Sequence, residues 1–191
     1  MRITGGEWGG RKLKAPAGDR VRPTQDRVRE ALFSMLMGAV PGALFIDLFA
    51  GTGAVGLEAL SRGASRVVWV EQDPRYAAVL QENVVAVTGK PGEVCRCGVL
   101  RWLKGAGCGM RADVVFADPP YAADGDSGFA QIMGLLETNR VVRPGGIFVA
   151  EMPEACAAEE TAGWRLVRDR TYGHTRLAVY RMGTEGTETT D

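Results

Sequence analysis

Short apolar runs and segments of helical periodicity alternate along most of this chain, from Ala43 to Glu151. The apolar runs predict strands at Ala43–Phe49, Arg66–Glu71, Glu93–Cys97, Asp113–Asp118 and Gly146–Glu151. The intervening segments predict helices at Ala54–Arg62, Pro74–Val87 and Gly128–Thr138, with a short helical turn at Leu100–Lys104. Continuous apolar strands are typical of a parallel sheet with helices on both faces. We therefore expect a doubly wound α/β fold.

The carboxyl-terminal part breaks this alternation. Trp164–Tyr172 and Thr175–Met182 predict two strands, and only Gly173-His174 separates them. Without an intervening helix the two strands should pair antiparallel, so we expect the sheet to end in a hairpin. Residues 183–191 are polar and rich in glycine and threonine, and we expect this tail to be disordered.

The amino-terminal part has a different pattern. Residues 1–15 predict a small β-hairpin around Gly9-Gly10, and helical periodicity follows from Thr24 to Gly38. Residues 1–37 carry eight Lys or Arg and four Asp or Glu, a net charge of +4 on a neutral chain. We expect residues 1–40 to form a basic extension and residues 41–182 to form the main domain. Charge of this kind is typical of a phosphate-binding arm and, nearly as often, of a solvated face.

Composition excludes several classes of protein. The 191 residues contain no apolar run near the roughly 20 residues that span a bilayer, and the amino terminus lacks a signal-peptide core. A cytoplasmic protein without a membrane partner is the expectation. The four cysteines should then be reduced thiols. No second cysteine pair or nearby histidine completes a tetrahedral set around Cys95 and Cys97, so we expect no metal.

A glycine-rich loop follows the first predicted strand, in Asp47-Leu-Phe-Ala-Gly51-Thr-Gly53-Ala-Val-Gly56. Such a loop lets a ligand lie against the backbone, and Glu71, 20 residues after Gly51, is placed to bind ribose hydroxyls. Both a dinucleotide and S-adenosylmethionine fit this pattern. Asp47 would repel phosphates but suits the cationic amino and sulfonium groups of S-adenosylmethionine. The loop therefore favours the latter cofactor.

Asp118-Pro119-Pro120-Tyr121 closes another predicted strand. Neither proline donates an N–H, and each disfavours helix in the residue before it, so the corner is stiff and its carbonyls stay available. Hydrogen-bond acceptors therefore gather beside an aromatic ring, which suits a planar amine. An ordinary strand-to-loop turn is the alternative for this segment taken alone.

With these residues in view, the chain resembles the RsmD family of bacterial methyltransferases, which modify a guanine N2 in small-subunit (16S) ribosomal RNA. The resemblance runs from about residue 1 to residue 182. It rests on Arg22-Pro-Thr-Gln-Asp-Arg-Val-Arg-Glu-Ala-Leu-Phe33, Asp47-Leu-Phe-Ala-Gly-Thr-Gly53, Gly56-Leu-Glu-Ala-Leu-Ser-Arg-Gly63 and Asp118-Pro-Pro-Tyr121. The first and third segments are much more specific than the glycine loop.

The resemblance implies a seven-stranded, Rossmann-like class I methyltransferase fold that uses S-adenosylmethionine. It implies that Glu71 holds the ribose and that Gln72 and Val99 flank the adenine, while the methionine part lies over the loop of Ala50, Gly51, Thr52 and Gly53. The partner would be 16S ribosomal RNA or the small ribosomal subunit, and we expect a monomer. Gly98 is a departure, because family members usually carry an acid there. Gly9 is another, since it replaces an arginine common in the hairpin tip.

These residues suggest a mechanism. The Asp118 carboxylate and the Pro119 carbonyl would accept the two N–H protons of the guanine amine and turn its lone pair toward the methyl group, next to Pro120. Tyr121 would stack on the unpaired or flipped base. The expected RNA-binding residues are Arg11, Lys12, Arg22, Arg27 and Arg29.

Three alternatives remain open at this point. An adenine-N6 methyltransferase of DNA or RNA would use the same corner, although only about forty residues precede the sheet for target recognition. A Rossmann-type oxidoreductase is disfavoured by Asp47 and the prolines. A non-catalytic RNA-binding factor on a methyltransferase scaffold is the third, and Gly98 keeps it open.

Overall fold

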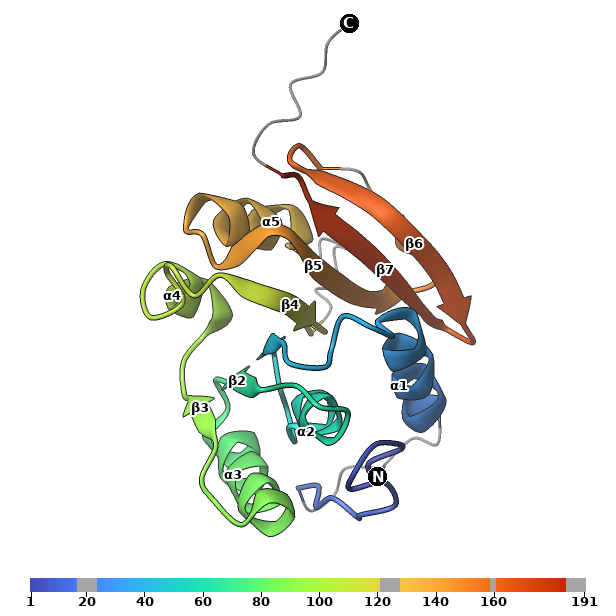
Figure 1. The fold of residues 1–191 in the computed structure, drawn as a ribbon, viewed down its shortest axis with the longest axis vertical. Coiled ribbons are helices and arrows are strands. Elements are labelled where there is room, and N and C mark those ends of the chain that lie inside the picture. The colour runs from blue at the N-terminus through green and yellow to red at the C-terminus, as the bar shows by residue number, and fades with distance from the viewer. Residues whose placement is uncertain (17–23, 121–127, 159–160, 185–191) are drawn as a thin grey trace, which may run out of the picture.

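Seven strands form one sheet in the order β3-β2-β1-β4-β5-β7-β6 (Figure 1). The computed structural model describes residues 1–16, 24–120, 128–158 and 161–184. Strands β1 to β5 are parallel, and β7 lies antiparallel between β5 and β6. The expected α/β sheet with a terminal hairpin is confirmed. The strand order reverses between β1 and β4, which is where open α/β sheets bind ligands.

The parallel strands are β1 (Leu44–Leu48), β2 (Arg66–Val70), β3 (Glu93–Cys95), β4 (Ala112–Ala117) and β5 (Val142–Pro153). The connecting helices are α2 (Ala54–Ser61), α3 (Pro74–Thr88), α4 (Val99–Leu103) and α5 (Phe129–Thr138). Their ends follow local chemistry. The Asp73 side chain accepts a hydrogen bond from Arg75 N at the start of α3, and Gly89 ends that helix with φ 75°.

Strand β5 begins earlier than the sequence predicts. It starts at Val142, before the Pro144-Gly145-Gly146 segment that we expected to be a turn. The register against β4 shifts between Ala112 and Val114, so the extra residues are absorbed in an irregular pairing. The strands β6 (Trp164–Tyr172) and β7 (Thr175–Met182) have the expected bounds.

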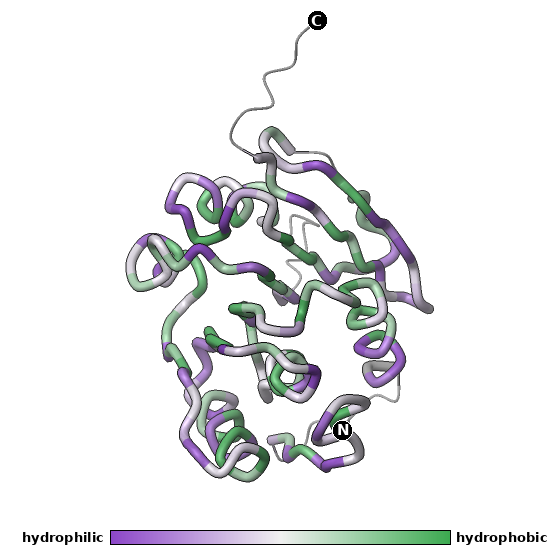
Figure 2. The backbone as a smooth tube through the Cα atoms, in the orientation of Figure 1, coloured by the Kyte–Doolittle hydropathy of each residue, from purple (hydrophilic) through white to green (hydrophobic). Residues whose placement is uncertain are grey.

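Helices cover both faces of the sheet and create two cores. The first core joins α1 (Thr24–Met35), α2 and α3 to the sheet through residues such as Leu32, Leu57, Leu80, Phe45 and Val149. The second core joins α4 and α5 to the other face through residues such as Leu103, Ile132, Val115 and Phe148. Figure 2 shows the hydrophobic colouring concentrated in the central strands between these layers.

The amino-terminal segment is only partly the hairpin that we predicted. One antiparallel bridge pairs Arg2 with Lys12, and a wide turn between them includes Gly6 and Gly10 at φ 79° and 85°. Ile3 is fully buried in the first core and anchors the segment beside α2. Backbone hydrogen bonds from Ile3 N to the Arg11 carbonyl and from Leu13 N to the Met1 carbonyl close the hairpin, and Glu7 N donates to the Ser61 carbonyl of α2.

Candidate active site

A cleft of about 510 Å³ opens at the carboxyl ends of β1, β2 and β4. Because neighbouring parallel strands end at one edge of a sheet, this cleft gathers residues that are far apart in the sequence. Its lining is Phe49, Gly51, Val70, Glu71, Gln72, Asp73, Tyr76, Cys97, Val99, Asp118, Pro119 and Pro120. The volume falls in the range of small-molecule sites.

The glycine loop forms one wall of the cleft. Gly51 has φ 53°, and a Cβ at this position would meet only Tyr76, at 4.0 Å, so a ligand has room to lie on its backbone. Gly53, with φ 79°, begins α2, and a Cβ there would come within 2.8 Å of Leu80. Gly56 packs on Trp69, where a Cβ would lie 2.1 Å from the indole nitrogen. Gly51 thus lets a ligand approach the backbone, Gly53 allows the turn into α2, and Gly56 allows α2 to pack closely on Trp69.

Glu71 is held at the cleft by the loop itself. Its Oε2 accepts a hydrogen bond of 2.8 Å from Gly51 N, and its Oε1 accepts one of 2.7 Å from Asp73 N. Each carboxylate oxygen has a second lone pair, so the group retains capacity to accept hydroxyl donors. Gln72 and Val99 line the same cleft.

Asp47 lies beneath the loop, outside the cleft lining. It is 1% exposed, and its Oδ2 accepts a hydrogen bond of 2.8 Å from Gly56 N at the start of α2. Burial raises its pKa well above the usual value, and the charges of Asp118 and Glu71 add to this effect. Asp47 therefore supports the glycine loop from inside. Ala50, Thr52 and Gly53 also lie outside the lining.

Asp118 and the two prolines form another part of the cleft lining. Asp118 and Pro120 are exposed to the cleft, and Pro119 is buried. The surrounding protein partly desolvates the Asp118 carboxyl, and this raises its pKa to about 6. A carboxylate with this pKa accepts hydrogen bonds at neutral pH and is close to taking up a proton. Tyr121, the fourth residue of this motif, lies outside the described residues.

Glu151 is a further acid at this edge that the sequence analysis missed as a site residue. Ala117 pairs with Ala150 across β4 and β5, so the next residues, Asp118 and Glu151, lie side by side. Burial, followed by the charge of Asp118, raises the pKa of Glu151 to about 8, while Arg29 counteracts this in part. The sequence offered one signal for Glu151, because it is an acid at the carboxyl end of a predicted strand, as Asp118 is.

The predicted RNA-binding residues fall into separate environments. Lys12 and Arg27 are exposed, and Arg11 is exposed while donating a hydrogen bond of 2.8 Å to the Val87 carbonyl. Arg22 lies outside the described residues. Arg29 requires a correction, because it is 5% exposed and contacts Asp26, Glu58 and the carbonyl of Arg2. Its guanidinium group bonds to these partners inside the protein and does not face solvent, where RNA phosphates would be.

Two absences concern the parts of the chain that the structure describes. Within them, no group of three or more His, Cys, Asp or Glu side chains is placed to hold a metal ion. A search of the same residues finds no helix with the length and apolar character needed to cross a membrane.

The comparisons with known proteins agree with this geometry. The family model described as Conserved hypothetical protein 95 matches residues 1–181. Ribosomal RNA small subunit methyltransferase D of Escherichia coli (strain K12) is 33% identical over 192 residues, covering 100% of this chain and 94% of that protein. The chain belongs to the RsmD family.

Solved structures extend the comparison to the fold. The Escherichia coli protein yhhF is 32% identical, with a TM-score of 0.84 over 97% of this chain and 99% of that one. SMU.776, solved in complex with SAH, is 14% identical, with a TM-score of 0.66 over 85% of this chain and 50% of that one. The second likeness concerns the fold alone. The fold of this RsmD-family chain is that of S-adenosylmethionine-dependent methyltransferases.

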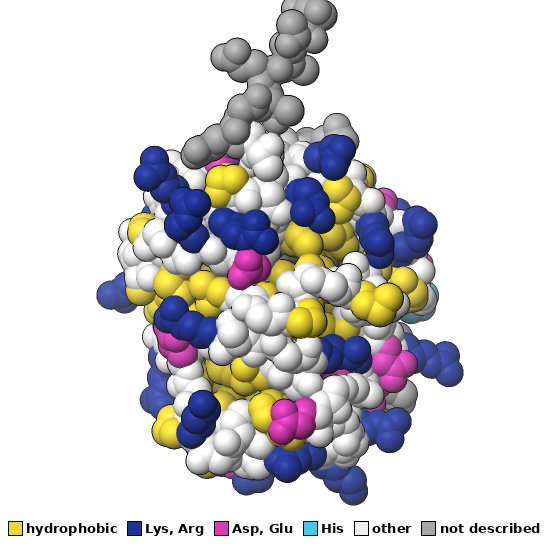
Figure 3. Space-filling model, viewed as in Figure 1, with side chains coloured by type: hydrophobic (Ala, Val, Ile, Leu, Met, Phe, Trp, Pro, Cys, Tyr) yellow, Lys and Arg dark blue, Asp and Glu magenta, His cyan; other side chains and the backbone are white. Residues whose placement is uncertain are grey.

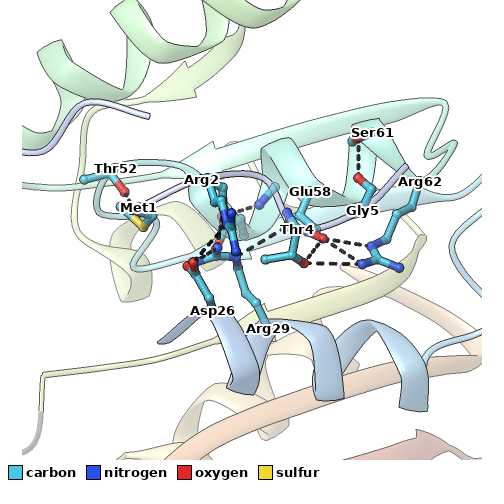
Figure 4. A network of polar contacts seen from close by, with 12 residues as sticks. Met1, Arg2, Thr4, Gly5, Asp26, Arg29, Thr52, Glu58, Ser61 and Arg62 are labelled. Atoms are coloured by element: carbon cyan, nitrogen blue, oxygen red, sulfur yellow. Dashed lines mark hydrogen bonds and ion pairs between the residues drawn. The ribbon is translucent and has the colours of Figure 1, made fainter. Parts of the chain in front are cut away.

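The two segments that carry the resemblance best, from α1 and α2, meet around Glu58 (Figure 4). Glu58 is fully buried, and its carboxylate accepts hydrogen bonds from Arg62, Arg29 and both the backbone N–H and the hydroxyl of Thr4. Asp26 completes the network with ion pairs to Arg29 at 2.8 Å and to Arg2 at 3.7 Å. In this RsmD-family chain these contacts hold residues 1–16, the amino-terminal arm, against α1 and α2.

Proposed function

We propose that this chain transfers a methyl group from S-adenosylmethionine to the exocyclic N2 of a guanine in 16S ribosomal RNA. One observation carries the proposal: the Asp118-Pro119 corner and the Gly51–Glu71 wall line the same cleft. The proposed amine acceptor and the proposed nucleoside site therefore belong to one cleft. The ribosomal substrate is drawn from the Escherichia coli relative, which is named for the small-subunit RNA.

The residues on the cleft wall fit the cofactor. Glu71 would bind the ribose hydroxyls, Gln72 and Val99 would flank the adenine, and the methionine part would lie along Gly51, where a side chain is absent. Asp47, Ala50, Thr52 and Gly53 would act by shaping the loop. When bound, the cofactor supplies an electrophilic methyl group on a positively charged sulfur.

Asp118 and Pro119 would then prepare the nucleophile. The lone pair of a guanine amine is delocalised into the ring, so accepting both of its N–H groups favours the pyramidal form that attacks. Holding the reacting atoms in near-attack geometry supplies about 7–11 kcal/mol in favourable cases. The amine proton becomes acidic as the N–C bond forms, and the carboxylate of Asp118, with a pKa raised to about 6, is suited to receive it.

The target guanine must reach the cleft as an unpaired base. Tyr121 is proposed to stack on it, and Pro120 to border it. The exposed residues Arg11, Lys12 and Arg27 are proposed to contact RNA phosphates, together with Arg22. We further propose that the chain acts as a monomer on the small ribosomal subunit or its RNA.

A methyl-transfer assay with tritiated S-adenosylmethionine tests the proposal. We expect label in small ribosomal subunits or naked 16S RNA from a strain lacking this protein, and none in duplex DNA. Mass spectrometry of the labelled RNA should find N2-methylguanine. Label in adenine, or cofactor binding without any transfer to RNA, would contradict the proposal.

A further inference from the structure

A row of arginines lies on β6, the edge strand farthest from the cofactor side of the sheet. Arg165, Arg168 and Arg170 are all exposed, and Arg181 on β7 joins them. Figure 3 shows Lys and Arg side chains gathered over the part of the molecule where Figure 1 places β6 and β7. We call these four residues the β6 arginine row.

A β-bulge brings the row onto one face. In a regular strand, Arg165 and Arg168 would point to opposite faces because side chains alternate. The register shifts between Leu166 and Arg168, so that Arg165, Arg168 and Arg170 pair with Arg181, Val179 and Leu177. Directly paired residues share a face of the sheet. Arg181, Val179 and Leu177 are alternate residues of β7 and lie on one face, so their three partners on β6 lie on that face too. The bulge therefore places the three β6 arginines on one face of the sheet despite their uneven spacing in the sequence.

The charges in this row are not neutralised within the described residues. None of their carboxylates lies within ion-pair distance of Arg165, Arg168, Arg170 or Arg181. Three of the four guanidinium groups contact backbone carbonyls instead, those of Met35, Asp169 and Gly145. Since Arg165 and Arg181 are direct cross-strand partners, this pairing of like charges opposes folding.

The row leads toward the active site. Leu177 pairs with Arg170 on one side and with Glu151 on the other, and Glu151 is in line with Asp118. Arg170 is therefore three strand spacings from the Asp118 corner, about 14 Å at the usual spacing. Along β6, alternate arginines on the face are about 7 Å apart, and each side chain reaches into solvent.

From this alignment we infer that the β6 arginine row binds the sugar-phosphate backbone of the RNA that flanks the target guanine. This surface is separate from the amino-terminal arm and lies on the other side of α1, whose carboxyl-terminal Met35 carbonyl accepts the hydrogen bond from Arg168. RNA held at both places would cross the carboxyl edge of the sheet and present one base to the cleft. The inference rests on the proposed function.

The test is the salt dependence of RNA binding. The variant Arg165→Gln/Arg170→Gln/Arg181→Gln removes three charges and keeps Arg168, whose bond supports α1. The dissociation constant for a 16S RNA fragment that the wild type methylates should be measured over a range of salt concentrations. We expect the slope of log Kd against log salt to fall by about 2 to 3, since each lost phosphate contact contributes 0.7–0.9. S-adenosylmethionine affinity should stay unchanged.

A matched control removes three exposed charges at the other sheet edge, in Lys90→Gln/Arg101→Gln/Lys104→Gln. Its salt slope should stay near that of the wild type. Equal slopes for the row variant and the wild type would overturn the inference, and self-association of the row variant would then assign the arginines to protection of an edge strand. If the wild type transfers no methyl group to any RNA, the proposed function is wrong. Unequal transfer and unequal salt slopes are separate measurements, so the failure of the proposed function and that of the inference are distinguishable.

Discussion

Carboxylates occur in two regions of this molecule where their surroundings differ sharply. Glu58 is fully buried between two helices and the amino-terminal arm, and Arg29 and Arg62 neutralise it. Asp118 and Glu151 lie side by side at the cleft edge, and burial raises their pKa values to about 6 and about 8. The matched charge holds elements together. At the cleft, desolvation brings the pKa values of two neighbouring acids close to neutrality, a feature that is common at functional sites.

The largest expected effect comes from breaking the matched cluster. Glu58→Ala should lower the free energy of unfolding by about 3–5 kcal/mol, because it breaks the buried ion pair with Arg29 and leaves the two Thr4 donors without their acceptor. Chemical denaturation monitored by circular dichroism measures this. Glu82→Ala is the control, since the exposed Lys14–Glu82 ion pair should contribute about 0–1 kcal/mol. Equal losses in the two variants would show that Glu58 is not a structural centre.

Removing the carboxylate at the cleft should act mainly on the rate of methyl transfer. Asp118→Asn should lower the methyl-transfer rate by about 10²- to 10³-fold, because the amide replaces one acceptor oxygen by a donor. Calorimetry should find S-adenosylmethionine affinity nearly unchanged. Asp113→Asn, at the far end of the same strand and bonded to Leu44 N and Arg143, is the matched control for a lost carboxylate. A variant at position 118 with normal turnover would remove the proposed role.

The raised pKa of Glu151 predicts that stability depends on pH. In the folded protein Glu151 keeps its proton up to about pH 8, whereas in the unfolded chain it ionises near its usual value of 4.5. Its contribution to stability is therefore complete below pH 4.5 and is lost as the pH rises toward 8. Glu151→Gln cannot ionise, so its stability relative to wild type should rise across this range. Parallel melting curves at pH 5, 6.5 and 8 test the sign, and a constant difference would refute it.

The smallest effect concerns Gly98, where the resemblance leads us to expect an acid. Gly98 has φ −66° and ψ 144° at the start of α4, and a Cβ there would lie 3.5 Å from Gln72 Oε1. Gly98→Asp should fit without strain and add an acceptor beside the expected adenine site. We expect S-adenosylmethionine to bind about 2- to 10-fold more tightly, the value of one hydrogen bond. Gly98→Ala provides the same Cβ without the carboxylate and should bind as the wild type does.

Much of the fold was predictable because its signals are local. Helix α3 starts at Pro74 after its capping Asp73, and the strands β6 and β7 are separated by two turn residues. The early start of β5 at Val142 was not predictable, because Pro144 and Gly145 read as a turn until β4 supplies a partner. Local propensity yields to tertiary pairing at such positions.

Within the site, the glycine loop and the strand ends indicated Gly51, Glu71 and Asp118, because the ends of parallel strands share one edge, and the family resemblance indicated Gln72 and Val99. It misplaced Arg29, since a basic residue in a basic segment reads as a solvent-facing cation when its buried partner, Glu58, is 29 residues away. Glu151 was missed for a related reason. Its importance depends on the register between β4 and β5.

By itself, the sequence determined the order of the elements, the glycine loop and the acceptor corner, because turns, periodicity and proline stiffness depend on neighbours along the chain. Only the tertiary structure decided which charges meet. The Glu58 cluster, the Asp118–Glu151 pair and the β6 arginine row all depend on register and burial, and a charge changes its role with the partner it finds and the water it loses.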